Sequence, residues 1–197
     1  MNFKKILAAA AVLSLSTASQ AGILFSDNFN AELLGLNHVP AGWSVTSGSV
    51  DVVSIFDFLP RNPGHGHGHY IDLDGTTRHG GTLVTSLMLT GGVPYAASFD
   101  LAGNARDAGN EIVTVDFGST RQVYTLDAAE PFANRTLRFT PDASGLFSLS
   151  FANAGGDDRG ALLDNVLVGS VPEPQTYALL AAGLLAVGFM SRRRNIN

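Results

Sequence analysis

The chain of 197 residues contains no cysteine. It therefore has no disulfide bond to stabilise a small fold, no thiol nucleophile and no thiolate ligand for a metal ion. The sequence also lacks the Gly-x-Ser-x-Gly, His-Glu-x-x-His and phosphate-binding glycine motifs of common enzyme classes. We therefore expect a protein that is not an enzyme and that is stabilised by packing or by a bound metal ion.

Lysine is absent between residues 22 and 171, where 7 arginines and 16 acidic residues give a formal charge of −9. Such a surface repels nucleic acid and anionic lipid, and it suits divalent cations or neutral sugars better. Chance pairs of carboxylates are expected at this acidic content, so they do not by themselves indicate a glycosidase. Nucleic acid is therefore not expected as a partner.

The N-terminal residues have the three parts of a secretory signal. Two lysines supply a positive region, Ile6–Leu15 is apolar, and Ser19 and Ala21 place small residues at the cleavage positions. The apolar stretch is too short for a membrane-spanning helix. The pattern predicts a signal peptide over residues 1–21, removed by signal peptidase before Gly22.

The C-terminus carries a Pro172-Glu173-Pro174 motif, then the uncharged segment Tyr177–Met190, and then Arg192, Arg193 and Arg194. A helix over residues 177–190 would be about 21 Å long at about 1.5 Å per residue, shorter than the roughly 30 Å hydrocarbon core of a bilayer. Snorkelling arginines can make up part of the difference, and they should stay in the cytoplasm. The segment is predicted to be a hydrophobic helix that enters the membrane at least transiently.

In this order the three features resemble a PEP-CTERM sorting signal over residues 171–197. The resemblance implies that the tail is recognised by an exosortase, a membrane peptidase-transferase of Gram-negative bacteria that make exopolysaccharide. It also implies a transient stay in the inner membrane, cleavage near the Pro-Glu-Pro motif, and delivery to the cell surface or extracellular matrix. A tail that is kept as a permanent anchor is the alternative.

The middle of the chain alternates apolar and polar residues. Period-2 alternation indicates half-buried strands, and glycine-rich turns separate them. No stretch between residues 22 and 171 keeps a helical period for three turns. Residues 22–170 are therefore predicted to form one all-β domain, an antiparallel sandwich or barrel. The clearest alternations lie over Tyr95–Leu101, Val113–Phe117, Leu137–Phe139, Phe147–Phe151 and Leu162–Val168.

Five segments of this domain have a recognisable order: Trp43–Val52, Tyr70–Gly75, Tyr95–Asn104, Leu149–Gly156 and Leu163–Val166. They resemble the galactose-binding-like jelly rolls that occur in secreted cell-wall proteins and in many carbohydrate-binding modules. The resemblance implies a β-sandwich of the jelly-roll type. It implies carbohydrate binding only by analogy, because this fold carries many functions.

Two polar loops are rich in side chains that hydrogen-bond sugars. Asn, Asp and Arg can make planar, bidentate hydrogen bonds with sugar hydroxyls. Neither loop contains an aromatic residue, and the single tryptophan, Trp43, is expected in the core. The alternative is that both loops are solvated connections. The predicted ligand-binding residues are Asn104, Arg106, Asp107 and Asn110 in one loop and Asp157, Asp158 and Arg159 in the other.

Histidines form the first group of candidate metal ligands. His65, His67 and His69 alternate along the chain, so three imidazoles could face one way and bind a transition metal. His79 could add a fourth ligand. The alternative is a solvated, glycine-rich loop that binds no metal.

Carboxylates form the second group. The jelly-roll resemblance implies a structural calcium ion where the first and last strands meet, with Asp27, Asn28 and Asp164 as ligands. Asp164 lies in line with Leu162 and Val166, so it is expected to point inward, where an unpaired carboxylate is costly.

Asp72 and Asp74 lie on one face of an extended segment and could supply oxygens to calcium. The alternative is that their carboxylates cap the amides of a turn.

These features predict an exported surface or matrix protein that associates with exopolysaccharide through its sandwich. Two alternatives stay open. One is a purely structural or adhesive matrix protein with no sugar site, and the other is a metal-handling surface protein that uses the histidine loop.

Overall fold

The computed structural model describes residues 22–58, 68–106, 109–171 and 182–184. Gly22–Val171 forms one compact unit, and the described residues of this unit form eleven strands and a short 3-10 helix, η2 (Ile55–Phe58). The strands are β1 (Ile23–Asp27), β2 (Ser44–Ser47), β3 (Asp51–Ser54), β4 (His69–Asp72), β5 (Thr82–Leu89), β6 (Tyr95–Ala102), β7 (Asn110–Phe117), β8 (Thr120–Asp127), β9 (Ala133–Phe139), β10 (Gly145–Asn153) and β11 (Leu162–Ser170).

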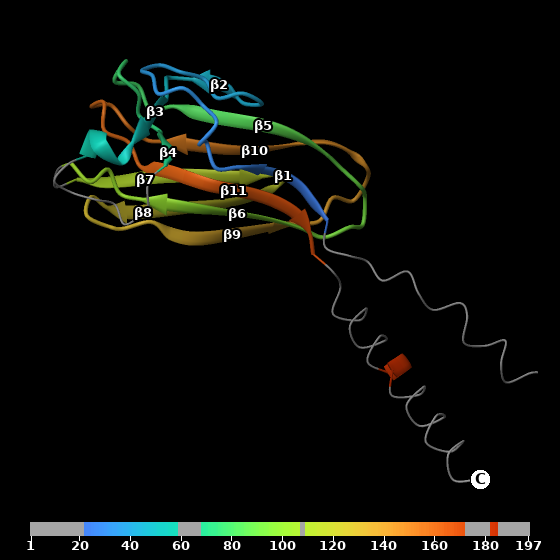
Figure 1. Cartoon of the computed structure of the whole chain (residues 1–197). Coiled ribbons are helices and arrows are strands. Elements are labelled where there is room, and N and C mark those ends of the chain that lie inside the picture. The colour runs from blue at the N-terminus through green and yellow to red at the C-terminus, as the bar shows by residue number, and fades with distance from the viewer. Residues whose placement is uncertain (1–21, 59–67, 107–108, 172–181, 185–197) are drawn as a thin grey trace, which may run out of the picture. The chain divides into compact units, whose positions relative to one another are not determined.

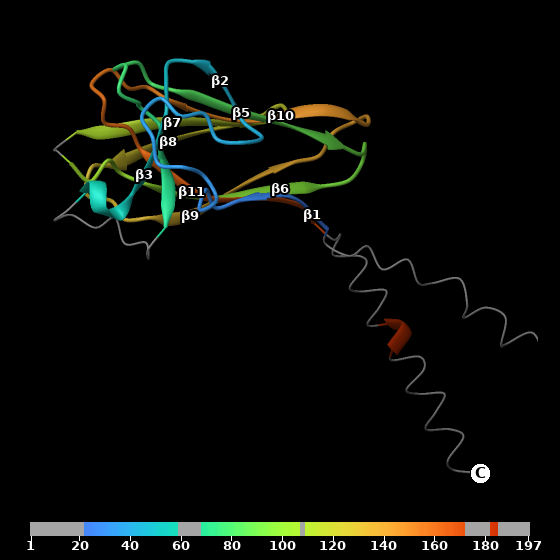
Figure 2. The ribbon, with the colours of Figure 1, turned by 45° about the horizontal axis from the view of Figure 1, so that its top comes forward.

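The strands form two antiparallel sheets that pack face to face (Figure 1 and Figure 2). The first sheet has six strands, in the order β3-β4-β11-β6-β9 with β1 paired to β11. The second sheet has five strands, in the order β2-β5-β10-β7-β8. This architecture confirms the predicted all-β antiparallel sandwich.

Aromatic rings fill the space between the sheets. The ring of Phe99 in β6 lies 5.0 Å from that of Phe151 in β10, edge to face, and Trp43 lies 6.1 Å from Phe151. Trp43 belongs to the buried core, as predicted. Burial of one such phenylalanine contributes about 1.5–3 kcal/mol, so contacts across the two sheets are a main source of stability.

Each alternating segment of the sequence lies within a strand, and its apolar positions face the opposite sheet, except Leu162 in β11. In β6, for example, Tyr95, Ala97, Phe99 and Leu101 are buried. The sequence did not indicate β8, where Leu126 is the one buried residue and the alternation is lost at the edge of the second sheet.

A bulge in β11 changes which side of the first sheet its residues face. The pairing of β11 with β6 shifts between Asp164 and Leu167, and Asn165 has a φ of 50°. Leu162 packs in a small second cluster with Val53 and Tyr70, whereas Val166 joins the main core. Asp164, which was expected to point inward, is buried at 6% exposure. Because the bulge adds a residue to the alternation, however, Leu162 and Val166 face opposite sides of the first sheet.

The two ends of the sandwich differ in the loops they carry. Gly22 and Val171 lie at one end, the terminal end, where Ser170 N donates to Gly22 O (3.0 Å) and Val171 N to Pro94 O (2.8 Å) (Figure 1). The loops after β4, β6 and β10 lie at the other end, the distal end.

The predicted signal peptide and sorting tail lie almost wholly outside the described residues. Ala182, Gly183 and Leu184 are helical. Within the part of the chain that the structure describes, no helix is long and apolar enough to cross a membrane.

Candidate functional sites

The two loops predicted to bind sugar meet at the distal end. Glu111, at the start of β7, accepts a hydrogen bond from Asn104 Nδ2 (2.8 Å) and another from Asn153 Nδ2 (3.3 Å). Ala154 N also donates to Ile112 O (2.9 Å). The loop after β6 and the loop after β10 are therefore joined through one carboxylate.

Much of this polar network is internal. Asn104 is 1% exposed, and its Oδ1 accepts from Arg106 N (2.9 Å). The Arg106 guanidinium donates to the carboxylate of Asp72. Because these groups already have partners within the protein, Asn104 and Arg106 stabilise the loops and offer little to a ligand.

The carboxylates of Asp72 and Asp74 cap turn amides. Asp72 Oδ1 accepts from Asp74 N (3.0 Å) and Gly160 N (2.8 Å), and Asp74 Oδ2 accepts from Gly156 N (2.6 Å) and Asp157 N (3.2 Å). Burial raises the pKa of Asp72 to about 7, although Arg106 and the amides act against this shift. The two carboxylates therefore make the turn-capping hydrogen bonds that the sequence analysis gave as the alternative to a calcium site.

Two acceptors of this network have no hydrogen-bond partner within the described residues: Asp74 Oδ1 and Asn153 Oδ1, on residues that are 0% and 7% exposed. Burial also raises the pKa of the Glu111 carboxyl, which the charges of Asp157 and Asp74 raise further.

The other predicted sugar ligands are on the surface. Asn110 and Arg159 are exposed, and Asp157 Oδ1 accepts from Arg159 N (3.1 Å). Asp158 has a φ of 71° and pairs with Arg78 at 3.5 Å. Asp107 lies outside the described residues.

The predicted calcium ligands make separate local contacts. Asp27 accepts from Phe29 N (2.8 Å) through Oδ1 and from Trp43 Nε1 (2.8 Å) through Oδ2. Asn28 Oδ1 accepts from Asn30 N (3.3 Å), and Asp164 Oδ1 from Asn165 N (2.6 Å). Among the described residues, no three His, Cys, Asp or Glu side chains are grouped to hold a metal ion. Calcium binding stays a prediction.

The histidine loop is largely outside the described residues, which include neither His65 nor His67. His69 begins β4, and its Nδ1 lies 2.9 Å from Glu32 O. His79 is exposed, and its Nδ1 lies 2.8 Å from Thr77 O. The sorting residues Pro172, Glu173, Pro174, Arg192, Arg193 and Arg194 also lie outside the described residues.

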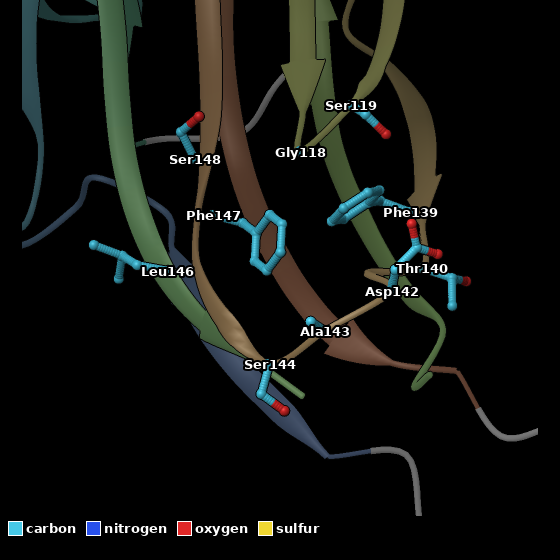
Figure 3. Close-up of a pocket in the computed structure, with 10 residues that line it drawn as sticks. All are labelled: Gly118, Ser119, Phe139, Thr140, Asp142, Ala143, Ser144, Leu146, Phe147 and Ser148. Carbon is cyan, nitrogen blue, oxygen red and sulfur yellow. The ribbon is translucent and has the colours of Figure 1, made fainter. Parts of the chain in front are cut away.

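A pocket of about 680 Å³ opens at the terminal end, and the sequence did not indicate it (Figure 3). Leu146 and the rings of Phe139 and Phe147 form its apolar side, and the two ring centroids are 5.1 Å apart. Phe139 is 8% exposed and belongs to the core, so Phe147 and Leu146 present most of the pocket's apolar surface. Its polar lining consists of Ser119, Thr140, Asp142, Ser144 and Ser148, which come from the turn after β7, the loop after β9, and β10.

Gly118 is needed for this shape. Its φ is 57°, and a Cβ atom there would lie 2.3 Å from Cε1 of Phe139. Only glycine adopts this backbone conformation easily and leaves room for the ring. The sequence predicted the strands that carry Phe139 and Phe147, but the approach of the β7–β8 turn to Phe139 is a tertiary contact.

The volume of the pocket lies within the roughly 300–1,000 Å³ range of small-ligand sites. Asp142 is the charged residue among its lining residues, and it is exposed. Ser144 Oγ already accepts from Gly91 N (2.9 Å). The pocket thus combines two phenyl rings with hydroxyl groups and a single carboxylate, which suits a small, uncharged, polar ligand.

Comparison with known proteins identifies the tail and the fold. Residues 170–194 match the PEP-CTERM protein-sorting motif. Such a motif indicates an exported protein that is sorted to the cell surface. No curated protein matches this chain by sequence.

Solved structures resemble the sandwich. The CBM22-1–CBM22-2 tandem domain of Xyn10C from Paenibacillus barcinonensis aligns with a TM-score of 0.51 at 14% identity, over 80% of this chain and 48% of that one. The K1 cleaved adhesin domain of Lys-gingipain from Porphyromonas gingivalis W83 aligns at 0.49 and 14%, over 76% and 98%. The CBM22-1–GH10 modules of Clostridium thermocellum xylanase 10B align at 0.45 and 12%, over 77% of this chain and only 29% of that one.

At identities this low, the likeness concerns the fold alone. The chain therefore combines a β-sandwich of the architecture seen in carbohydrate-binding modules with a PEP-CTERM sorting motif at its C-terminus.

Proposed function

We propose that the protein is processed by signal peptidase and by an exosortase, passes through the inner membrane, and is delivered to the cell surface or extracellular matrix of a Gram-negative bacterium. There it associates with exopolysaccharide as a non-catalytic binding protein. The sorting motif at residues 170–194 supports the route. The pocket beside Phe139 and Phe147 is the observation that carries the binding role.

The pocket suits a sugar for two reasons. The apolar face of a sugar ring packs against an aromatic ring, and its hydroxyls exchange hydrogen bonds with Ser, Thr and Asp side chains. The formal charge of −9 over residues 22–171 favours a neutral glycan over an anionic one. The distal loops are the weaker candidate, because Asn104 and Arg106 have partners within the protein.

The test is glycan-array binding by the full chain in detergent. Phe147→Ala and Asp142→Ala should each weaken binding about tenfold or more, whereas Arg159→Ala at the distal end should bind like the unaltered protein. Thermal unfolding of each variant shows whether Phe147→Ala has merely disturbed the core. If Arg159→Ala or Asn110→Ala abolishes binding instead, the site lies in the distal loops.

The structural or adhesive matrix protein is the second candidate, favoured by the internal hydrogen bonds of the distal loops. It would bind no glycan on the array. A metal-handling role for His65, His67 and His69 is the third. Titration with zinc or copper tests it, and equal affinity in the triple His→Ala variant would exclude this loop as the site.

A further inference from the structure

The outer face of the second sheet is nearly uncharged, although residues 22–171 carry a formal charge of −9. Its outward side chains are mostly Ser, Thr, Ala and aliphatic residues at alternate positions of five strands. Asp116 and Arg121 lie opposite each other on it, and Arg121 donates two hydrogen bonds to Asp116, at 2.6 and 3.0 Å. Asp127, at the distal edge, accepts from Ala129 N (2.9 Å). The middle of this face has no net charge.

The same face exposes large apolar side chains. Met88 is 67% exposed and Leu146, its neighbour across the strands, is 66% exposed. Ile112 and Val123, on β7 and β8, are 44% and 50% exposed. Between these two groups lie the small residues Ser150 and Ala152 of β10. The two groups are separated by these small residues and by the Asp116–Arg121 pair, which is opposite Ser150. Exposed apolar side chains bordered by polar ones in this way occur at protein interaction sites.

The charge distribution favours a second copy of this chain as the partner of this face. Two copies of a domain with a formal charge of −9 repel each other over most of their surfaces. They repel least where this neutral face meets its own copy. Aliphatic and small hydroxyl side chains, without an exposed aromatic ring for a sugar to stack on, favour a second protein sheet over a glycan.

The area of the face is sufficient. The strands β2, β5, β10, β7 and β8 have 4, 8, 9, 8 and 8 residues, and at about 3.4 Å per residue and about 4.8 Å between strands they give a flat area of about 600 Å² per copy. Because side chains roughen this area, the accessible surface exceeds it and approaches the roughly 800 Å² per partner of a standard interface. Small central side chains let two sheets pack at the usual distance of about 10 Å.

We propose that the protein forms a two-fold symmetric dimer in which the second sheets of two copies pack face to face (Figure 2 separates this sheet from the first). The face shares Leu146 with the pocket lining, so the test of the dimer uses Ile112 and Val123 of β7 and β8, which lie outside that lining.

The experiment is light-scattering mass measurement and sedimentation of the full chain in detergent. The unaltered protein should have the mass of two chains at micromolar concentration. Val123→Glu and Ile112→Glu should each raise the dissociation constant tenfold or more, because each would bury an unpaired charge between the two sheets. Leu34→Glu, at a position 52% exposed and off this face, is the matched control and should remain dimeric.

All variants keep the same tail, so association through the tail affects each of them equally. Thermal unfolding checks that the two face variants fold, and their exposed positions make folding the expected result. A single-chain mass for the unaltered protein, or unchanged dimers in both face variants, would overturn the proposal. Loss of glycan binding in Val123→Glu with no change in mass would overturn it as well, and would assign the face to a glycan.

Discussion

Arg106 donates a hydrogen bond to the carboxylate of Asp72, which lies 34 residues earlier in the chain. The Asp72 side chain is 2% exposed and that of Arg106 is 31% exposed. Because Asp72 also caps Asp74 N and Gly160 N, the guanidinium connects the loop after β6 to the loops after β4 and β10. One ion pair therefore helps to fix the whole distal end.

Removal of this guanidinium should be strongly destabilising. Breaking a buried ion pair typically costs about 3–5 kcal/mol, because one charge is left without a partner. Arg106 is partly exposed, and the pKa of Asp72 is already raised to about 7, so the carboxyl left behind can take up a proton instead of staying an unpaired charge. We therefore expect Arg106→Ala to lower the free energy of unfolding by about 2 kcal/mol, below that range. Urea unfolding measures it. Arg159→Ala, nearby but exposed, should change stability by less than about 0.5 kcal/mol. Equal effects would show that the ion pair contributes little.

The sequence predicted the strands better than it predicted the sites. Alternation in Tyr95–Leu101 follows directly from burial of one sheet face, so local pattern and fold agree. The bulge at Asn165 is not encoded in such a pattern, and it puts Leu162 and Val166 on opposite sides of the first sheet. The pairing of Arg106 with Asp72 is a tertiary contact, so a local sequence pattern does not predict it either. Loop composition indicated sugar-binding chemistry, but not that Asp72 would already engage that side chain.

Gly118→Ala should distort the pocket as well as destabilise the fold. The new methyl group would meet the Phe139 ring, at a backbone φ of 57° that disfavours side chains. Gly92→Ala is a matched control, with a φ of 75° and nothing within 4 Å of its Cβ position. We expect a loss of about 1 kcal/mol for Gly92→Ala and clearly more for Gly118→Ala. Urea unfolding compares the two, and equal losses would mean that the ring moves aside freely.

If Asp27, Asn28 and Asp164 bind a calcium ion, the ion should stabilise the native state. A ligand at about 100 times its Kd adds about 2.7 kcal/mol when it binds only the folded protein. Thermal unfolding of the full chain should therefore show a higher Tm in calcium than in EDTA, and Asp164→Asn should remove the difference. An identical Tm in calcium and EDTA would contradict the site. A difference that survives Asp164→Asn would place the ion elsewhere.

Processing of the two ends predicts a defined mass for the mature protein. A protein that is cut before Gly22 and near Pro174 should be recovered from the cell surface or medium, and it should lack Arg192, Arg193 and Arg194. Intact-mass measurement on whole cells and medium tests this directly. Glu173→Ala should leave the N-terminal cut unchanged while uncut tails accumulate in the inner membrane, because the sorting motif alone is altered. If the unaltered protein also keeps its arginines in the inner membrane, the tail is a permanent anchor, and the matrix role loses its main support.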